Sequence, residues 1–118
     1  MLRGLENSVL GVWVAHGEGR FRCQNDEMDN TAEVIALQYM TTDGTTQQYP
    51  DNPNGSDLAL AGISSSDGRH LAMMPHPERT ILKWQAPWIS PELSRELQDQ
   101  TEYPWQQMFH NSYNWCLE

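Results

Sequence analysis

The sequence predicts an α/β domain that contains β-hairpins and ends in a helix. Two turn sequences, Thr41-Thr42-Asp43-Gly44 and Ser66-Asp67-Gly68, each lie between segments of strand character, which is typical of hairpins. Apolar side chains recur at helical spacing from Trp105 to Cys116, and Pro104 before them suits the start of a helix. The 118 residues are enough for one domain with a modest core.

Five segments are expected to be strands. Residues 9–14 form an apolar run rich in β-branched side chains, which predicts a buried strand. Residues 34–40 and 45–49 are expected to pair as the first hairpin, and residues 58–64 and 70–74 as the second. The second hairpin leads directly into a Pro-His-Pro-Glu segment.

The segments between the strands carry loop and helix signals. Residues 49–56 hold two prolines and a glycine and predict a loop. Residues 25–32 are polar and acidic, with room for at most one short helical turn. Residues 90–98 predict a short helix, because Ser90 suits the N-cap and Pro91 the first helical position. No repeat or internal boundary is evident, so the whole chain is expected to belong to one domain.

The charge balance argues against two classes of partner. Seven Lys and Arg stand against sixteen Asp and Glu, a formal net charge of −9. Nucleic acids and anionic membranes are bound by clustered Lys and Arg, so neither is an expected partner. No run of about 18 apolar residues predicts a membrane span, and no signal peptide is expected at the first residues. Cys23 and Cys116 lack metal-ligand spacing and are interpreted as reduced thiols of a cytoplasmic protein.

The segment Met73-Met74-Pro75-His76-Pro77-Glu78 is the sharpest local signal for chemistry. Its prolines disfavour helix and predict an extended chain, in which side chains two residues apart point the same way. His76 and Glu78 are then expected to meet at the end of a buried strand. A carboxylate beside an imidazole fixes its tautomer and stabilises the imidazolium, which is the base-and-orienter half of a nucleophilic triad. The alternative is a surface loop held by two prolines, in which the pair is fortuitous.

The nucleophile that such a pair would serve is not evident. A triad needs Ser or Cys on a sharp strand-to-helix turn flanked by small residues. Cys23 lies between Arg22 and Gln24, which would crowd that turn. Cys116 lies in the last helical turn, and the serines at 64–66 lie in a hairpin turn. Either the pair is not catalytic, or its nucleophile lies outside these residues.

A second candidate is the glycine loop His16-Gly17-Glu18-Gly19, which follows the first expected strand. Two glycines around a charged residue mark a tight loop whose backbone groups can approach a small polar ligand. The alternative is an ordinary glycine loop with a solvated Glu18. His70 and His110 are interpreted as structural. The sequence holds no phosphate loop, metal-spaced His/Cys set or dinucleotide motif.

Read together, three segments resemble one family of enzymes. They are His16-Gly17-Glu18-Gly19-Arg20, Asn52-Pro53-Asn54-Gly55-Ser56, and the run from Ala61 that ends in Met-Met-Pro-His-Pro-Glu-Arg. In this order they resemble the glutaminase domain of the large single-chain phosphoribosylformylglycinamidine synthases, and the match continues through Pro104-Trp105 to the last helix. Many class I glutamine amidotransferases share the Pro-His-Pro-Glu part, whereas its combination with the Asn-Pro-Asn-Gly-Ser block is specific.

The resemblance implies a fold and an activity. Residues 1–118 would be the C-terminal portion of a single class I glutamine amidotransferase domain, the second half of a flavodoxin-like α/β/α sandwich. Such a domain hydrolyses glutamine and supplies ammonia to a synthetase domain, where ATP and Mg²⁺ serve the amidination of formylglycinamide ribonucleotide in purine biosynthesis. The expected partners are therefore glutamine and the other domains of the same polypeptide, and no cofactor or metal is expected in this chain itself.

The resemblance also implies roles for individual residues. His76 would be the general base and then the acid that protonates the leaving ammonia, and Glu78 would orient His76. The loop at His16 and Gly17 would lie beside the bound glutamine and contact it mainly through its backbone. The family's cysteine nucleophile lies upstream of these residues, so the chain alone is expected to be inactive. Residues 25–32 are shorter than the family pattern, which usually has a helix there.

A function of a different class is the alternative: an amidotransferase-like remnant kept as a non-catalytic interaction or structural module. The retained pair of His76 and Glu78 favours the enzyme, because a remnant has no physical need to keep a base and its orienter. An upstream Gly-x-Cys-x-Gly turn between a strand and a helix would decide for the enzyme.

Overall fold

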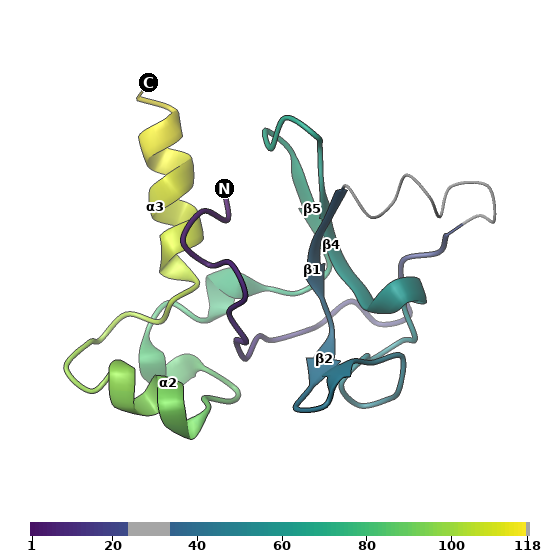
Figure 1. The fold of residues 1–118 in the computed structure, drawn as a ribbon, viewed down its shortest axis with the longest axis horizontal. Helices are drawn as coiled ribbons and strands as arrows, with labels where there is room; N and C mark the ends of the chain where they lie inside the picture. Colours follow the sequence, from purple (N-terminus) through teal and green to yellow (C-terminus); the bar gives the residue numbers. More distant parts are fainter. Residues whose placement is uncertain (24–33, 118) are drawn as a thin grey trace. The chain divides into compact units, whose positions relative to one another are not determined.

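The computed structural model describes residues 1–23 and 34–117 of the chain (Figure 1). The backbone divides into two compact units, one formed by Met1–Trp13 with His76–Glu118 and the other by Val14–Pro75. The expected helical turn at residues 25–32 lies outside the described residues. Antiparallel sheets and a C-terminal helix confirm the α/β class in its coarse form.

The Val14–Pro75 unit is built on a three-stranded antiparallel sheet of order β1-β4-β5 (Figure 1). These strands span Ile35–Gln38, Leu60–Ser64 and Leu71–Met73. β4 is the central strand, and Ala61 on it packs with Tyr39 and Ala59 in a small buried core. The sheet thus confirms the second expected hairpin and places a strand of the first beside it.

The turn between β4 and β5 holds its shape through one serine. The Ser65 hydroxyl donates to Asp67 Oδ1 at 2.5 Å and accepts the backbone N–H of His70 at 3.0 Å. The hydrogen bond from Ser65 is the main reason that the pKa of Asp67 lies below its usual value. The backbone of His70 is therefore part of this turn.

The first expected hairpin is much shorter than the sequence predicted. Only β2 (Met40–Thr41) and β3 (Gly44–Thr45) pair, and residues 46–49 form no strand. Asn52 gives the physical reason, because its side-chain amide donates to Thr46 O at 3.0 Å and holds the chain in a loop. Side-chain hydrogen bonds of Asn compete in this way with a strand ladder.

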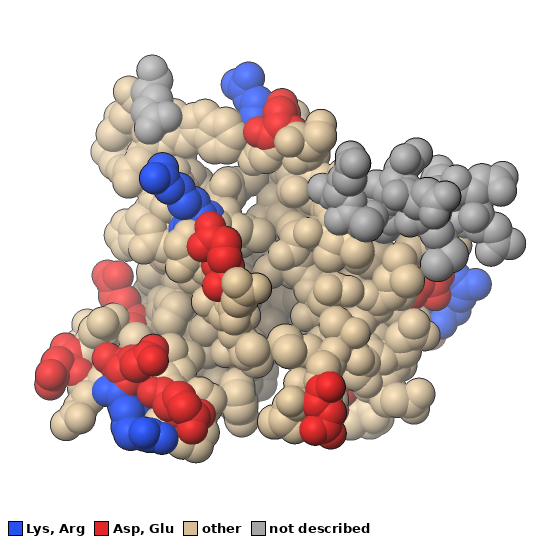
Figure 2. Space-filling view, in the orientation of Figure 1, with Lys and Arg blue, Asp and Glu red and all other residues tan. Residues whose placement is uncertain are grey.

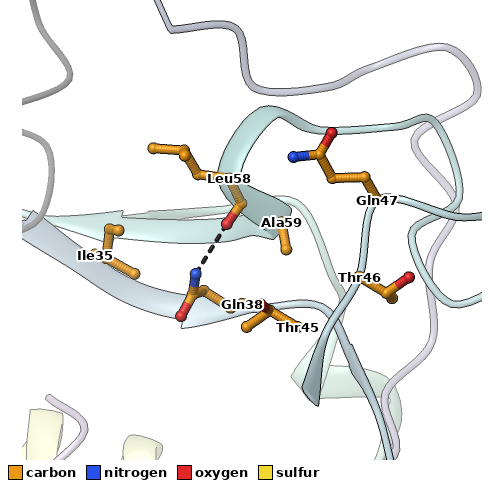
Figure 3. Close-up of a pocket in the computed structure, with 7 residues that line it drawn as sticks. All are labelled: Ile35, Gln38, Thr45, Thr46, Gln47, Leu58 and Ala59. Carbon is orange, nitrogen blue, oxygen red and sulfur yellow. Dashed lines mark hydrogen bonds between the residues drawn. The ribbon is translucent and has the colours of Figure 1, made fainter. Parts of the chain in front are cut away.

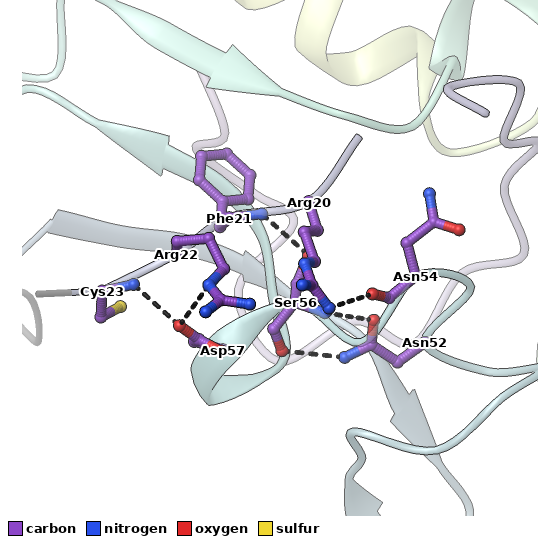
Figure 4. Close-up of polar contacts among 8 residues, drawn as sticks. All are labelled: Arg20, Phe21, Arg22, Cys23, Asn52, Asn54, Ser56 and Asp57. Carbon is purple, nitrogen blue, oxygen red and sulfur yellow. Dashed lines mark hydrogen bonds and ion pairs between the residues drawn. The ribbon is translucent and has the colours of Figure 1, made fainter. Parts of the chain in front are cut away.

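Asn52 is the centre of this loop and is almost fully buried, with 1% of its surface exposed (Figure 4). Its amide nitrogen also donates to Ser56 O at 3.0 Å, and its oxygen accepts from Ser56 N at 2.9 Å. The Ser56 hydroxyl in turn accepts from Phe21 N at 3.1 Å. The Asn-Pro-Asn-Gly-Ser block is therefore a clamp between the loop and the chain near residue 21.

We expect Asn52→Ala to destabilise this unit by about 3 kcal/mol, because it leaves buried backbone groups without partners at ~1–3 kcal/mol each. Calorimetry of the full-length protein measures the shift of the transition that includes this unit. Asn114→Ala, at an exposed position near the end of the chain, is the matched control and is expected to leave that transition in place. An Asn52 variant as stable as the control would contradict the clamp.

In the other unit, the expected strand at residues 9–14 is not formed. Instead, the Gly11 N–H donates to Tyr103 Oη at 3.0 Å, and the Gly11 carbonyl accepts from Trp105 Nε1 at 3.1 Å. An added Cβ on Gly11 would lie 2.3 Å from Trp88 O, so only glycine fits there. The apolar run therefore packs closely against aromatic residues and does not pair as a strand. Trp13 in this run keeps 46% of its surface exposed.

Both expected helices are present in this unit. α2 spans Pro91–Glu96, and the Ser90 hydroxyl caps it by accepting from Leu93 N at 3.1 Å. α3, yellow in Figure 1, spans Gln106–Trp115 and buries Met108. No helix of the described residues is both long and apolar enough to cross a membrane.

Candidate active site

The structure brings His76 and Glu78 together. The distance from His76 Nδ1 to Glu78 Oε1 is 2.7 Å, which is hydrogen-bond length. The chain reaches this geometry by a different route from the expected one, because Pro77–Arg79 form a 3₁₀ turn with His76 at its N-cap, so the segment is not extended. Proline suits the first position of a helical turn, since its φ is already set and its missing N–H has no partner there.

Two anchors hold the backbone of this turn. The His76 N–H donates to Trp13 O at 2.8 Å, in an isolated antiparallel bridge between the two residues. The indole Nε1 of Trp13 donates to Gln85 O at 2.8 Å. On the other side, Pro77 is buried and its carbonyl accepts from Thr80 N at 2.9 Å. Trp13, which the sequence predicted only as part of a strand, thus fixes the backbone that carries His76.

The electrostatics of the pair favour a charged carboxylate. Partial desolvation pushes the pKa of Glu78 up, but the hydrogen bond from His76 and the backbone outweigh it and leave the pKa below its usual value. Glu78 therefore accepts a hydrogen bond from the N–H at Nδ1 of His76, and the lone pair of the neutral ring lies on Nε2.

His76 Nε2 is available for chemistry. Within the described residues it has no hydrogen-bond partner, and a third of the His76 side chain, 33%, is exposed, against 54% for Glu78. An imidazole with Nδ1 held by a carboxylate and Nε2 open is the arrangement of a general base. The pair can take a proton from a thiol or hydroxyl and return it to a leaving group.

The second candidate, the loop at His16 and Gly17, lies in the Val14–Pro75 unit. The Gly19 N–H donates to His16 O at 2.8 Å, which closes a turn, and Gly17 takes a φ of +57° that favours glycine. The His16 ring lies 3.2 Å from Tyr39 Oη at Nε2 and 3.0 Å from Asn54 Nδ2 at Nδ1. The expected tight loop is present.

Sequence reasoning assigned no role to Asn54, which the structure places under this loop. Its amide nitrogen donates to the carbonyls of Gly17 and Gly19, at 2.5 and 2.9 Å, in addition to its contact with His16. The backbone carbonyl of Asn54 accepts from Arg20 Nη1 at 3.4 Å (Figure 4). The only sequence signal was the Asn-Pro-Asn-Gly turn composition, because asparagine side chains commonly bond nearby backbone in such turns.

The two cysteines of the chain lie in different surroundings. Cys23 N donates to Asp57 Oδ2 at 2.9 Å, beside a loose ion pair between Arg22 and Asp57 at 3.8 Å (Figure 4). Cys116 is exposed and lies at the C-cap of α3. In the part of the chain that the structure describes, no three His, Cys, Asp or Glu are placed to hold a metal ion.

An open hollow of about 440 Å³ in the Val14–Pro75 unit offers little chemistry (Figure 3). In it, Gln38 Nε2 donates to Leu58 O at 2.8 Å. None of its lining residues is titratable; they are Ile35, Gln38, Thr45, Thr46, Gln47, Leu58 and Ala59. On the face drawn in Figure 2, the Lys and Arg side chains lie beside acidic ones and do not gather into a patch.

Comparison with known proteins gives the family. A model of the CobB/CobQ-like glutamine amidotransferase domain matches residues 1–116. The chain is 47% identical to a phosphoribosylformylglycinamidine synthase of Drosophila melanogaster and 48% identical to one of Homo sapiens, each over 122 aligned positions and 100% of the chain. It is 41% identical to the Dictyostelium discoideum synthase over 98% of the chain. The chain spans 9% of the length of each of these relatives. These matches confirm the resemblance seen in the sequence, and the chain belongs to the CobB/CobQ-like glutamine amidotransferase domain family.

Proposed function

We propose that the chain is the C-terminal portion of a glutaminase domain in a phosphoribosylformylglycinamidine synthase. Residues 1–118 would complete a flavodoxin-like class I sandwich whose other half lies upstream. The family match over nearly the whole chain supports this proposal, as do synthases that are 47–48% identical and much longer than the chain. The domain would release ammonia from glutamine for the ATP-dependent amidination of formylglycinamide ribonucleotide in purine biosynthesis, in the cytoplasm.

The observation that carries the proposal is the hydrogen bond between His76 Nδ1 and Glu78 Oε1 at 2.7 Å, while Nε2 has no partner among the residues that the structure describes. His76 Nε2 would take the proton of a cysteine thiol supplied by the upstream half. The thiolate would then attack the side-chain amide carbon of glutamine, and the carbon–nitrogen bond would break as the imidazolium gives its proton to the leaving ammonia. A water molecule, deprotonated by the same imidazole, would hydrolyse the glutamyl thioester.

The other roles divide between this chain and the rest of the polypeptide. Glu78 would hold the His76 ring and stabilise its charged form during both proton transfers. The His16–Gly17 loop would contact glutamine through its backbone. ATP and Mg²⁺ would bind in the synthetase domain, so glutamine and that domain are the partners of this chain.

Substitution of Glu78 tests the pair directly. We expect Glu78→Gln in the full-length protein to lower glutamine-dependent kcat, but by a factor about tenfold to a hundredfold smaller than the factor for His76→Ala. The reason is that the amide still holds the ring but stabilises the imidazolium less. Steady-state rates with glutamine and with ammonia measure the effect, and the ammonia rate is expected to stay unchanged.

Glu92→Gln is the matched control for this experiment, because Glu92 is an exposed residue of α2 that contacts Arg95 at 3.4 Å. Its rates are expected to equal those of the unsubstituted protein. Equal losses for Glu78→Gln and His76→Ala would show that Glu78 does more than orient the base. An undiminished glutamine rate for both variants would refute the catalytic role of this pair. It would favour the alternative in which this chain is a non-catalytic module.

A further inference from the structure

We propose that Asn54 is the residue that positions the His16–Gly19 loop for glutamine, an inference that rests on the proposed function. Asn54 itself need not touch glutamine. Its side chain donates to the carbonyls of Gly17 and Gly19 and so holds the loop backbone in one conformation. The residue would therefore set the affinity for glutamine, while the chemical step belongs to His76.

The first support is the density of contacts on one nitrogen. Asn54 Nδ2 lies within hydrogen-bond distance of three acceptors: Gly17 O, Gly19 O and His16 Nδ1. All three belong to one turn, about 37 residues away in the sequence. Because two of them are carbonyls, the amide must present its NH₂ group here, since its oxygen would be repelled. Asn54 thus ties both glycines of the turn to the Asn-Pro-Asn-Gly-Ser block.

The same contacts fix the state of the His16 ring. The NH₂ group of Asn54 cannot accept a hydrogen bond, so the ring nitrogen that faces it, Nδ1, is the unprotonated one, and the neutral ring carries its proton on Nε2. Nε2 lies 3.2 Å from the Tyr39 hydroxyl, to which it can donate. Burial raises the pKa of Tyr39 to about 12, so the phenol stays neutral and able to accept. Both ring nitrogens therefore have partners within the protein, which fix the orientation of the His16 ring.

The backbone amides of the loop are left for a ligand. The Gly17 carbonyl is bonded to Asn54, whereas the N–H groups of Gly17 and Glu18 have no acceptor among the described residues. Gly17 and Glu18 are exposed, and an added Cβ on Gly17 would meet nothing within 4 Å. Free N–H groups on an open turn suit a carboxylate or amide oxygen, and glutamine carries both.

The side chains of Asn54 and Asn52 form hydrogen bonds with different parts of the chain. All three bonds of Asn52 go to its own loop, at Thr46 and Ser56, and its loss is expected to lower stability. The side-chain bonds of Asn54 go to the glycine turn, so its loss should free that turn without opening the buried clamp. The two asparagines of one motif therefore predict separable defects, one in stability and one in KM.

The test uses Asn54→Ala and Asn54→Asp in the full-length protein, with KM and kcat measured for glutamine and for ammonia. Both variants are expected to raise KM for glutamine about tenfold, as for the loss of one or two hydrogen bonds. The kcat at saturating glutamine and the ammonia-dependent rate should change less than about threefold. Asn114→Ala is the matched surface control and should leave all four constants unchanged.

The aspartate variant separates the two kinds of contact. Its carboxylate cannot donate to the carbonyls of Gly17 and Gly19, but it can accept from His16 if the ring proton moves to Nδ1 and Tyr39 donates to Nε2. A raised KM in Asn54→Asp therefore assigns the effect to the loop carbonyls. The same elevation in both variants is the expected result.

Two results would overturn the inference. One is a KM for glutamine within twofold of the unsubstituted value in both variants. The other is a parallel fall in glutamine and ammonia activity with a lowered unfolding temperature, which would make Asn54 a stability residue like Asn52. If instead His76→Ala retains full glutamine activity, the proposed function fails, whatever the Asn54 variants show.

Discussion

We expect His76→Ala in the full-length protein to abolish glutamine-dependent synthesis while synthesis with added ammonia continues. General bases contribute about 10²- to 10⁴-fold to a rate, and His76 would serve both as the base and as the acid of the same reaction. Its Nδ1 is held by Glu78 at 2.7 Å, and its Nε2 has no partner within residues 1–23 and 34–117. The ATP-using step is proposed to lie in another domain and has no need of the imidazole.

The measurement is a pair of rate assays on one preparation, with glutamine or ammonia as nitrogen donor. His110→Ala is a close control, because His110 Nε2 also lies near a carboxylate, Glu102 Oε2, at 3.4 Å. That pair is exposed on α3 and the segment before it, and its loss is expected to change neither rate. A variant of His76 that loses both activities would show that His76 supports the structure or the synthetase step, and would end the base assignment.

The features predicted correctly from sequence depend on neighbours in the chain. The turn around Ser66-Asp67-Gly68 specifies the β4–β5 hairpin, because Ser65 bonds Asp67 and the N–H of His70 within six residues. The cap and proline of α2 act in the same local way. The His76–Glu78 pair was also found, since two residues apart is a short distance in either an extended chain or a 3₁₀ turn.

The features missed from sequence depend on hydrogen-bond partners that lie outside the segment concerned. Residues 9–14 have the composition of a buried strand, yet Gly11 is bound by Tyr103 and Trp105, more than 90 positions away. The first hairpin ends early because Asn52, which lies outside the expected strands, takes the carbonyl of Thr46. Propensity and pattern describe how a segment would behave alone, and a tertiary partner of this strength overrides them.

The apolar surface of the described residues bears on the second large effect, the behaviour of the chain by itself. Phe109 and Tyr113 on α3 and Leu117 just after its end recur every four residues and stay exposed, Tyr113 by 67% and Leu117 by 70%. In the other unit, β1 and β5 are both edge strands of the three-stranded sheet. Open edges and apolar stripes invite association, and an upstream half of the same domain would be their natural cover.

We therefore expect the 118 residues alone to hydrolyse no glutamine and to fold poorly or self-associate. The nucleophile is proposed to lie in the upstream half and not at Cys23 or Cys116, so no thioester is expected to form on this chain. Mixing it with the upstream, cysteine-containing half should make it more soluble and restore some glutamine hydrolysis, because that half would supply both the thiol and the missing sheet neighbours. Glutamate release and size in solution are the measurements, and the upstream half with its cysteine changed to serine is the control. A well-folded monomer that hydrolyses glutamine alone would contradict the fragment interpretation, and Cys23 would then be the first residue to substitute.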